Sequence, residues 1–210
     1  EVVLEFDADG HVIDAHPEDD AFTHRIIEMF MVEANEAVAR TFAGLDIPVL
    51  RRTHPEPKFG DLEELRLFAR SVGVGMPEEP SRADLQRLLQ ATKESEASRA
   101  VHFAVLKTLT QATYSPAEIG HFALASDHYA HFTSPIRRYP DLVVHRTLRE
   151  MRMGASRRRR GKTWADRLPE IARHTSEIER RAEDAERDLT QLKKVRFMAD
   201  KVGETFTGCV

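Results

Sequence analysis

The residues best suited to chemistry lie in the segment His131–Arg146, where a capping serine, a proline and paired arginines follow one another. Ser134 is a good helix N-cap and Pro135 suits the first helical position, which predicts a helix from Ser134 to about Met153. Arg137 would then lie in the first turn, beside free backbone N–H groups and the positive end of the helix dipole. A guanidinium in this setting can hold two phosphate oxygens, so we expect Arg137 to contact phosphate.

The predicted helix also contains a second proline, Pro140, which lies too deep for a first turn and should kink the helix. Asp141 stands four residues after Arg137 and four before His145, so these side chains can pair along one helix face. We interpret Asp141, His145 and Arg146 as braces of the helix.

Other residues suggest sites through less specific patterns. His128 and His131 beside Asp127 could hold a metal ion, but the spacing is generic and no HExxH motif is present. Ser134 could be a nucleophile, but it serves better as a cap, and no G-x-S-x-G elbow surrounds it. Tyr129 is the aromatic residue that we retain as a candidate for stacking on a base.

Basic residues are concentrated in one segment. Residues 137–162 contain nine Arg and one Lys against one Asp and one Glu, a net charge of +8, so the other residues sum to −12. A basic block in an acidic chain indicates a surface that faces a polyanion. For Arg157–Arg160 we favour a solvated loop instead. We expect Arg137 and Arg138 to face the polyanion.

The composition is that of a foldable chain. Its 210 residues are 41% apolar and 31% charged, with a mean hydropathy of −0.46 and no stretch long enough for a membrane span. The single cysteine, Cys209, excludes an intramolecular disulfide and a multi-cysteine zinc site. We expect a cytoplasmic setting and no membrane partner. The chain starts at Glu1 without a leader and stops within a strand-like alternation, so we expect it to be an excerpt of something longer.

Hydrophobic periodicity and turn residues predict a mostly helical chain with a few strands. A hairpin is expected over 2–14, a short strand over 45–52, and a further strand over 203–210. Helices are expected up to about 42, then from 60 to about 73, over 83–91 with Ser81 as N-cap, and over 95–110, 134–153 and 166–201.

The segment His131–Arg146 closely resembles the signature of the RNB family of exoribonucleases, and its Arg137–Arg138 pair is more similar to the ribonuclease R branch. Residues 26–31 and 34–39 resemble a family helix of the type IEEFM…ANEAVA, and 185–188 resemble the family's AERD. Residues 202–210 look like the opening of an S1 RNA-binding domain.

This resemblance implies an α+β fold: residues 1–201 as the C-terminal part of an RNB catalytic domain, with helices packed on a sheet, and residues 202–210 as the first strand of an S1 barrel. The implied activity is processive 3′→5′ hydrolysis of single-stranded RNA to nucleoside monophosphates, with Mg²⁺ as cofactor. Arg137 would contact the phosphate near the scissile bond and act in catalysis. Glu186 would lie close to the 3′-terminal nucleotides, and Glu28 would help to recognise ribose hydroxyls.

One departure from the family is that the aspartate cluster that binds metal is expected upstream of this segment. Asp19–Asp20 is the only adjacent Asp pair, and acidic residues before a helix suit its dipole. We therefore expect the chain alone to be nearly inactive. Two alternatives stay open: a non-catalytic RNA-binding or regulatory protein with a degenerate RNB domain, and an interaction scaffold that uses the long final helix.

Overall fold

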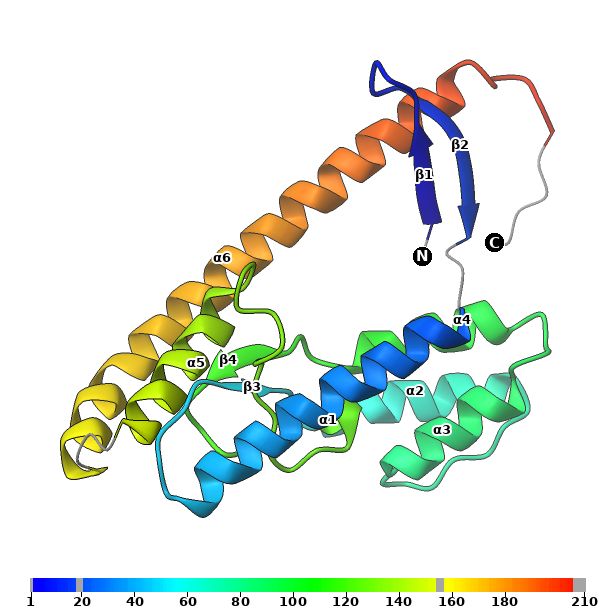
Figure 1. Cartoon of the computed structure of the whole chain (residues 1–210). Coiled ribbons are helices and arrows are strands. Elements are labelled where there is room, and N and C mark those ends of the chain that lie inside the picture. Colours follow the sequence, from blue (N-terminus) through cyan, green and yellow to red (C-terminus); the bar gives the residue numbers. More distant parts are fainter. Residues whose placement is uncertain (1, 18–20, 154–156, 206–210) are drawn as a thin grey trace.

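The computed structural model describes residues 2–17, 21–153 and 157–205 (Figure 1). The helices are α1 (Phe22–Gly44), α2 (Phe59–Ser71), α3 (Arg82–Ala91), α4 (Ser98–Thr108), the 3-10 helix η1 (Phe122–Leu124), α5 (Tyr139–Arg152) and α6 (Arg157–Ala199). The strands are β1 (Val2–Phe6), β2 (Val12–Pro17), β3 (Arg51–Thr53) and β4 (Thr113–Ser115). The α+β class is confirmed, with helices dominant and the strands arranged as two small antiparallel pairs.

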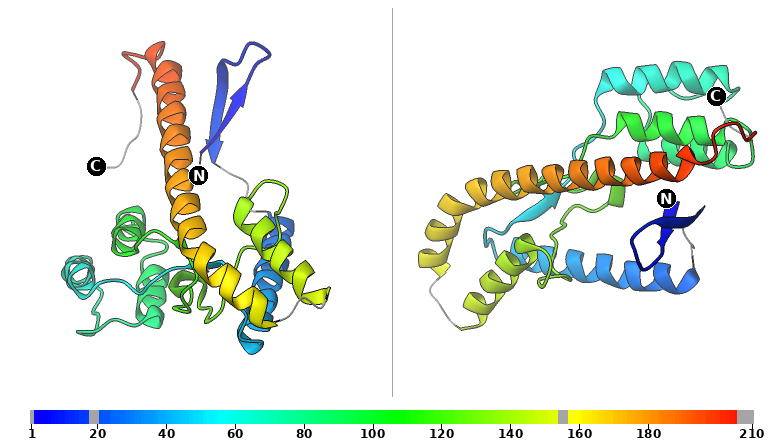
Figure 2. Two further views of the ribbon diagram at one scale, coloured as in Figure 1. Left: turned by 90° about the vertical axis from the view of Figure 1, so that its left-hand side faces the viewer. Right: turned by 90° about the horizontal axis from the view of Figure 1, so that it is seen from above.

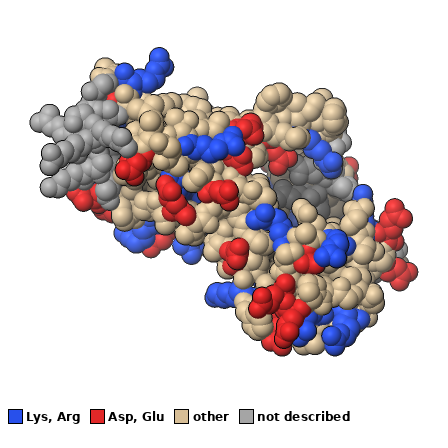
Figure 3. All heavy atoms as spheres, turned by 90° about the horizontal axis from the view of Figure 1, so that it is seen from below, with Lys and Arg blue, Asp and Glu red and all other residues tan. Residues whose placement is uncertain are grey.

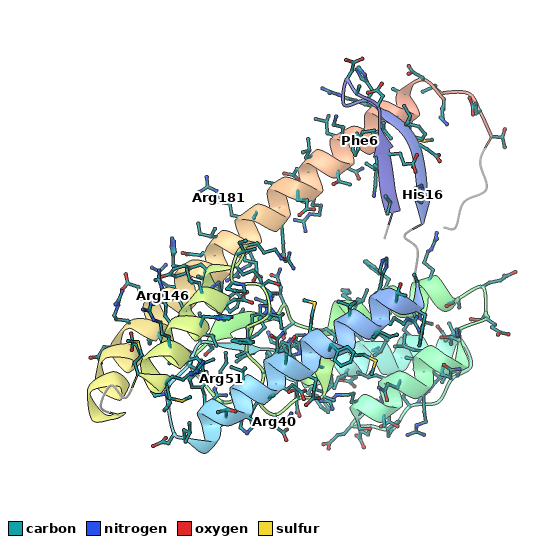
Figure 4. All side chains as sticks on the ribbon, viewed as in Figure 1. Phe6, His16, Arg40, Arg51, Arg146 and Arg181 are labelled. Atoms are coloured by element: carbon teal, nitrogen blue, oxygen red, sulfur yellow. The ribbon has the colours of Figure 1, made fainter. Side chains whose placement is uncertain are left out.

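The hairpin of β1 and β2 forms where the sequence predicts it. The Asp7 carboxylate accepts the backbone N–H groups of Asp9 (3.0 Å) and His11 (2.8 Å), and Gly10 adopts a positive φ of 78° that closes the turn. Near the C-terminal end of α6, Lys193 donates to the Gly10 carbonyl oxygen and lies over the Phe6 ring, so the hairpin docks on that helix (Figure 4).

Helices α2, α3 and α4 form a compact unit around Leu65, Leu88 and Val101. The predicted cap at Ser81 is confirmed as a reciprocal capping box: the Ser81 side chain accepts the Asp84 N–H, and the Asp84 carboxylate accepts the Ser81 N–H. Both views of Figure 2 show this unit set to one side of α1 and α5.

A second region joins α1, α5, α6 and the strand pair β3–β4. Ala39 and Phe42 of α1 pack with Val144 of α5, while Val143 on the same helix packs with Leu168 of α6. Figure 2 shows α6 running as one long element past β4 and α5, which brings residues distant in sequence to one place. No helix in the described part of the chain is long and apolar enough to cross a membrane.

The predicted start of α5 at Ser134 is wrong: the helix begins at Tyr139, and Arg138 is its N-cap. The reason is Pro140, whose ring would clash with the carbonyl of residue 136 in a helix that started at Ser134. In the observed helix, Pro140 lies in the first turn, where proline is tolerated. Arg137 therefore precedes the helix and lies in a turn, in which the Arg137 and Arg138 N–H groups both donate to the Ser134 carbonyl oxygen.

Other boundaries also shift. Residues 45–50 are not a strand, and β3 is confined to Arg51–Thr53. The four residues Arg157–Arg160 form the beginning of α6 instead of a loop, which suits the high helix propensity of arginine. Asp19 and Asp20, and residues 206–210 of the expected S1 strand, lie outside the described residues.

Candidate nucleic-acid interface

The turn 134–138 is fixed by Asp141, which is completely buried. One oxygen of its carboxylate, Oδ1, accepts the Ser134 N–H and a guanidinium N–H of Arg138, each at 2.8 Å. Asp141 thus braces the turn before the helix, in agreement with its predicted structural role. Its ion-pair partner, however, is Arg138 and not Arg137. His145 is also structural, because its Nε2 donates to the Phe132 carbonyl oxygen at 2.8 Å.

A cavity of about 750 Å³ opens beside this turn. Arg137, Arg138, Tyr139 and Pro140 line one side, and Tyr114 of β4 lines another. The remaining lining residues come from α6. They are spaced one, three or four positions apart, so they lie on one face of that helix. They are Arg167, Glu170, Ile171, His174, Thr175, Ile178 and Glu179. The volume lies in the range of small-molecule and cofactor sites, so it has room for a nucleotide.

Arg137 is exposed at the rim of this cavity. Among the residues that the structure describes, no acidic side chain pairs with its guanidinium. The other cations of the region are engaged: Arg138 pairs with Asp141, and Arg52 of β3 pairs with Glu179. Among the described residues that line the cavity, Arg137 is thus a guanidinium that can accept an external anion without first breaking an ion pair of the fold.

Tyr114, which also lines the cavity, is held by two neighbours. Its hydroxyl lies 2.9 Å from His131 Nδ1, and the Arg52 guanidinium lies 4.7 Å from the centre of its ring. Burial, with help from Glu179, raises the pKa of Tyr114 to about 12. Burial, with help from Arg138, lowers the pKa of His131 to about 3. At neutral pH the tyrosine is therefore protonated and the imidazole neutral, and the tautomer of His131 decides which of the two groups donates the hydrogen bond.

Tyr129 does not fit the predicted role in base stacking. It is 6% exposed, its hydroxyl accepts a hydrogen bond from Asn35, and its ring meets those of His121 and His131 edge to face. The ring has no open face for a base in this arrangement.

The structure does not bring the two predicted glutamates to the cavity lining. Glu28 is exposed in the first half of α1. Glu186 is exposed on α6, seven residues after Glu179, so it lies on the same helix face about 10 Å further along the axis.

Sequence reasoning missed two contributors to the site. Asn35 is buried in α1 and bonds to the segment before the turn, and Ile171 and Ile178, seven residues apart, lie on the face of α6 that lines the cavity. The signals in the sequence were the place of Asn35 in the family-like run 34–39 and the periodicity of α6, and neither of them names a partner.

Charge is mixed on one face of the molecule. On the face seen from below, Lys and Arg side chains lie among Asp and Glu side chains (Figure 3). On this face a contact with an anion therefore depends on local geometry.

No group of three or more His, Cys, Asp or Glu residues suited to a metal ion occurs within residues 2–17, 21–153 and 157–205. The candidate pair His128 and His131 thus gains no third ligand there. The described residues do not fit a metal centre, and we assign none of them to one.

The buried histidines predict an acid-sensitive fold. Burial lowers the pKa of His121 to about 4 and that of His131 to about 3, from an ordinary value of 6.5. Below pH 6.5 the unfolded chain binds more protons than the folded chain, so each histidine lowers the free energy of unfolding by about 1.4 kcal/mol per pH unit as pH falls towards 4. Urea unfolding at pH 7.0 and 5.5 should show a loss of about 2 to 3 kcal/mol.

The His131→Phe variant should lose about half of this pH dependence, because one of the two titrating groups is gone. The exposed His102 on α4 provides the control, and His102→Gln should keep the full dependence. A free energy of unfolding that does not change between the two pH values would contradict the role of both histidines.

The chain is similar to known proteins over the part that contains the 134–138 turn and helices α1 to α5. The chain matches the RNB domain family over residues 1–154. It is 41% identical to ribonuclease R 1 of Lactococcus lactis over 89% of this chain and 23% of that protein. Two structures of Mycoplasma genitalium RNase R, one with double-stranded RNA and one with ribose methylated single-stranded RNA, superpose with TM-scores of 0.92 and 0.90 at 27% identity.

Those structures cover 100% and 98% of this chain, which in turn covers 38% and 33% of theirs. The chain thus spans under half the length of the proteins it matches. The family match ends at residue 154, before α6 begins, while the structural match continues through that helix. Since the family match includes the whole 134–138 turn and most of the sequence, the chain belongs to the RNB family and is similar to its ribonuclease R members.

Proposed function

We propose that this chain is the RNA-binding part of an exoribonuclease that degrades single-stranded RNA processively from the 3′ end to nucleoside monophosphates. The observation that carries the proposal is the exposed Arg137 guanidinium, held on a fixed turn at the rim of the 750 Å³ cavity without an acidic partner among the described residues. The ribonuclease R structures that share its fold contain RNA, which supports RNA as the polyanion.

In this proposal Arg137 pairs with non-bridging oxygens of the phosphate at the scissile bond. A planar guanidinium matches these oxygens in a bidentate contact and stabilises the negative charge that grows on them during in-line attack by water. The neighbouring Arg138 keeps the turn in place through Asp141 and adds positive potential at the cavity. Tyr114 stays protonated at neutral pH and therefore adds no negative charge beside the phosphate.

Glu186 and Glu28 keep their proposed roles towards the RNA. Glu186 is exposed on the same face of α6 as Glu179, which suits a contact with the terminal nucleotides beyond the cavity. The exposed carboxylate of Glu28 can accept hydrogen bonds from ribose hydroxyls, the groups that distinguish RNA from DNA.

The metal of this reaction is proposed to be Mg²⁺, as the family resemblance implies. We expect its ligands outside the described residues, among which no group of three or more His, Cys, Asp or Glu could hold a metal ion. The domain boundary at residue 201 and the S1 strand after it also remain proposals.

Binding of the 210-residue chain to a labelled single-stranded RNA and to DNA of the same sequence tests the proposal. We expect RNA to bind more tightly than DNA, and binding to weaken about tenfold or more between 50 and 200 mM salt, because phosphate contacts release counterions. Adding Mg²⁺ should release no mononucleotide. An absence of RNA binding at low salt would favour the scaffold alternative. Mononucleotide release that Arg137→Ala abolishes would contradict the expected inactivity of the chain.

A further inference from the structure

Asn35 is the only asparagine of the chain, and it is 2% exposed in the middle of α1. Its carboxamide bonds to a segment about a hundred residues away. Oδ1 accepts the N–H groups of Phe132 (2.9 Å) and Thr133 (3.2 Å), and Nδ2 donates to the Tyr129 hydroxyl (3.0 Å). One buried side chain thus satisfies three groups of the irregular segment 129–133, which leads into the turn of Arg137.

The same segment is held from the other side by α5. The His145 ring stacks on Phe132 with centres 4.2 Å apart, and its Nε2 donates to the Phe132 carbonyl oxygen. The next N–H along the chain, that of Ser134, donates to Asp141. Three consecutive N–H groups, those of residues 132, 133 and 134, therefore each have a side-chain acceptor from one of two helices.

Arg137 lies three residues after Ser134, the last of these pinned residues. Its N–H donates to the Ser134 carbonyl oxygen at 3.3 Å, so the position of Ser134 determines where the turn presents the guanidinium. A backbone that is fixed before the ligand arrives loses less conformational entropy on binding than a mobile backbone. The contacts of Asn35 should therefore influence RNA affinity as well as the stability of the fold.

We propose that Asn35 is a positioning residue for Arg137, which acts by holding residues 132–134 and hence the turn that offers the guanidinium to phosphate. The inference rests on the proposed phosphate contact of Arg137. A purely structural Asn35 would contribute to stability, but it would not be coupled to Arg137 in RNA binding.

A double-mutant cycle in the full 210-residue chain separates these roles, with a labelled single-stranded oligouridylate as the probe. Asn35→Ala should weaken binding about tenfold when Arg137 is present, and less than about twofold when Arg137 is already Ala, because nothing is then left to position. Asn35→Asp keeps an acceptor at Oδ1 and should recover most of the affinity. All constants are measured at a temperature where circular dichroism shows each variant folded.

Thr108→Ala is the matched control, since it removes another buried side-chain hydrogen bond, that of Thr108 Oγ1 to the Val105 carbonyl oxygen on α4. It should leave RNA affinity unchanged. If Asn35→Ala does not fold, Asn35→Ser replaces it, because the shorter side chain cannot reach all three partners.

Equal losses from the Asn35 substitution in both Arg137 backgrounds would overturn the positioning role and leave the proposed function intact. The positioning role is also overturned if the Asn35 variants bind RNA as tightly as the unmodified chain. If Arg137→Ala itself leaves the affinity unchanged, the proposed phosphate contact fails, and the positioning role fails with it.

Discussion

Replacing Asp141 by Ala is expected to lower the free energy of unfolding by about 3 kcal/mol, the range seen when one partner of a buried ion pair is removed. Asp141 is fully buried, and its Oδ1 accepts from both Arg138 and the Ser134 N–H. Without it, the Arg138 guanidinium, whose side chain is 23% exposed, loses its acidic partner, and a backbone N–H loses its acceptor. Urea unfolding at pH 7 measures the change.

Asp141→Asn is the matched control, because it retains an acceptor oxygen but removes the charge. Asp141→Asn should lower the free energy of unfolding clearly less than Asp141→Ala does. If Asp141→Ala lowers the free energy of unfolding by less than about 1 kcal/mol, the ion pair contributes no more than an exposed surface pair does. That result would contradict the role of Asp141 in bracing the turn.

Replacing Arg137 by Ala is expected to weaken the binding of single-stranded RNA by about tenfold or more, as the loss of a charge-assisted contact implies. The folding stability should stay nearly unchanged, because the side chain is exposed and the described residues provide no ion-pair partner for it. Equilibrium titration with a labelled oligonucleotide at fixed low salt measures the affinity.

Two variants isolate the geometry of this contact from charge alone. Arg137→Lys keeps the charge but loses the planar guanidinium. Its RNA affinity should therefore lie between that of the unmodified chain and that of Arg137→Ala. Arg99→Ala removes an exposed arginine from α4, far from the cavity, and should have a much smaller effect. If Arg99→Ala and Arg137→Ala lower the RNA affinity equally, binding depends only on the net charge of the chain.

Local signals predicted much of the fold. The hairpin of β1 and β2 and the N-cap at Ser81 arise from neighbours in sequence, and both are present in the structure. The start of α5 was misplaced because Ser134 and Pro135 form a good helix start by themselves. The observed start also depends on Pro140, and the group that accepts the Ser134 N–H is Asp141, seven residues later.

The candidate site was only partly predictable for a similar reason. The family-like run of residues pointed to Arg137 and the turn around it. The cavity, however, needs Tyr114 of β4 and one face of α6, which only tertiary packing brings together. The burial of Tyr129 and its bond to Asn35 join residues 94 positions apart, and no local pattern records such a contact.

The salt dependence of RNA binding tests the phosphate contact of Arg137 most directly. Each phosphate contact on a single strand contributes about 0.7 to the slope of the logarithm of the binding constant against the logarithm of salt concentration. The slope for Arg137→Ala should therefore be shallower by about 0.7 than that of the unmodified chain. Identical slopes for the two chains would show that the Arg137 guanidinium does not touch the RNA backbone.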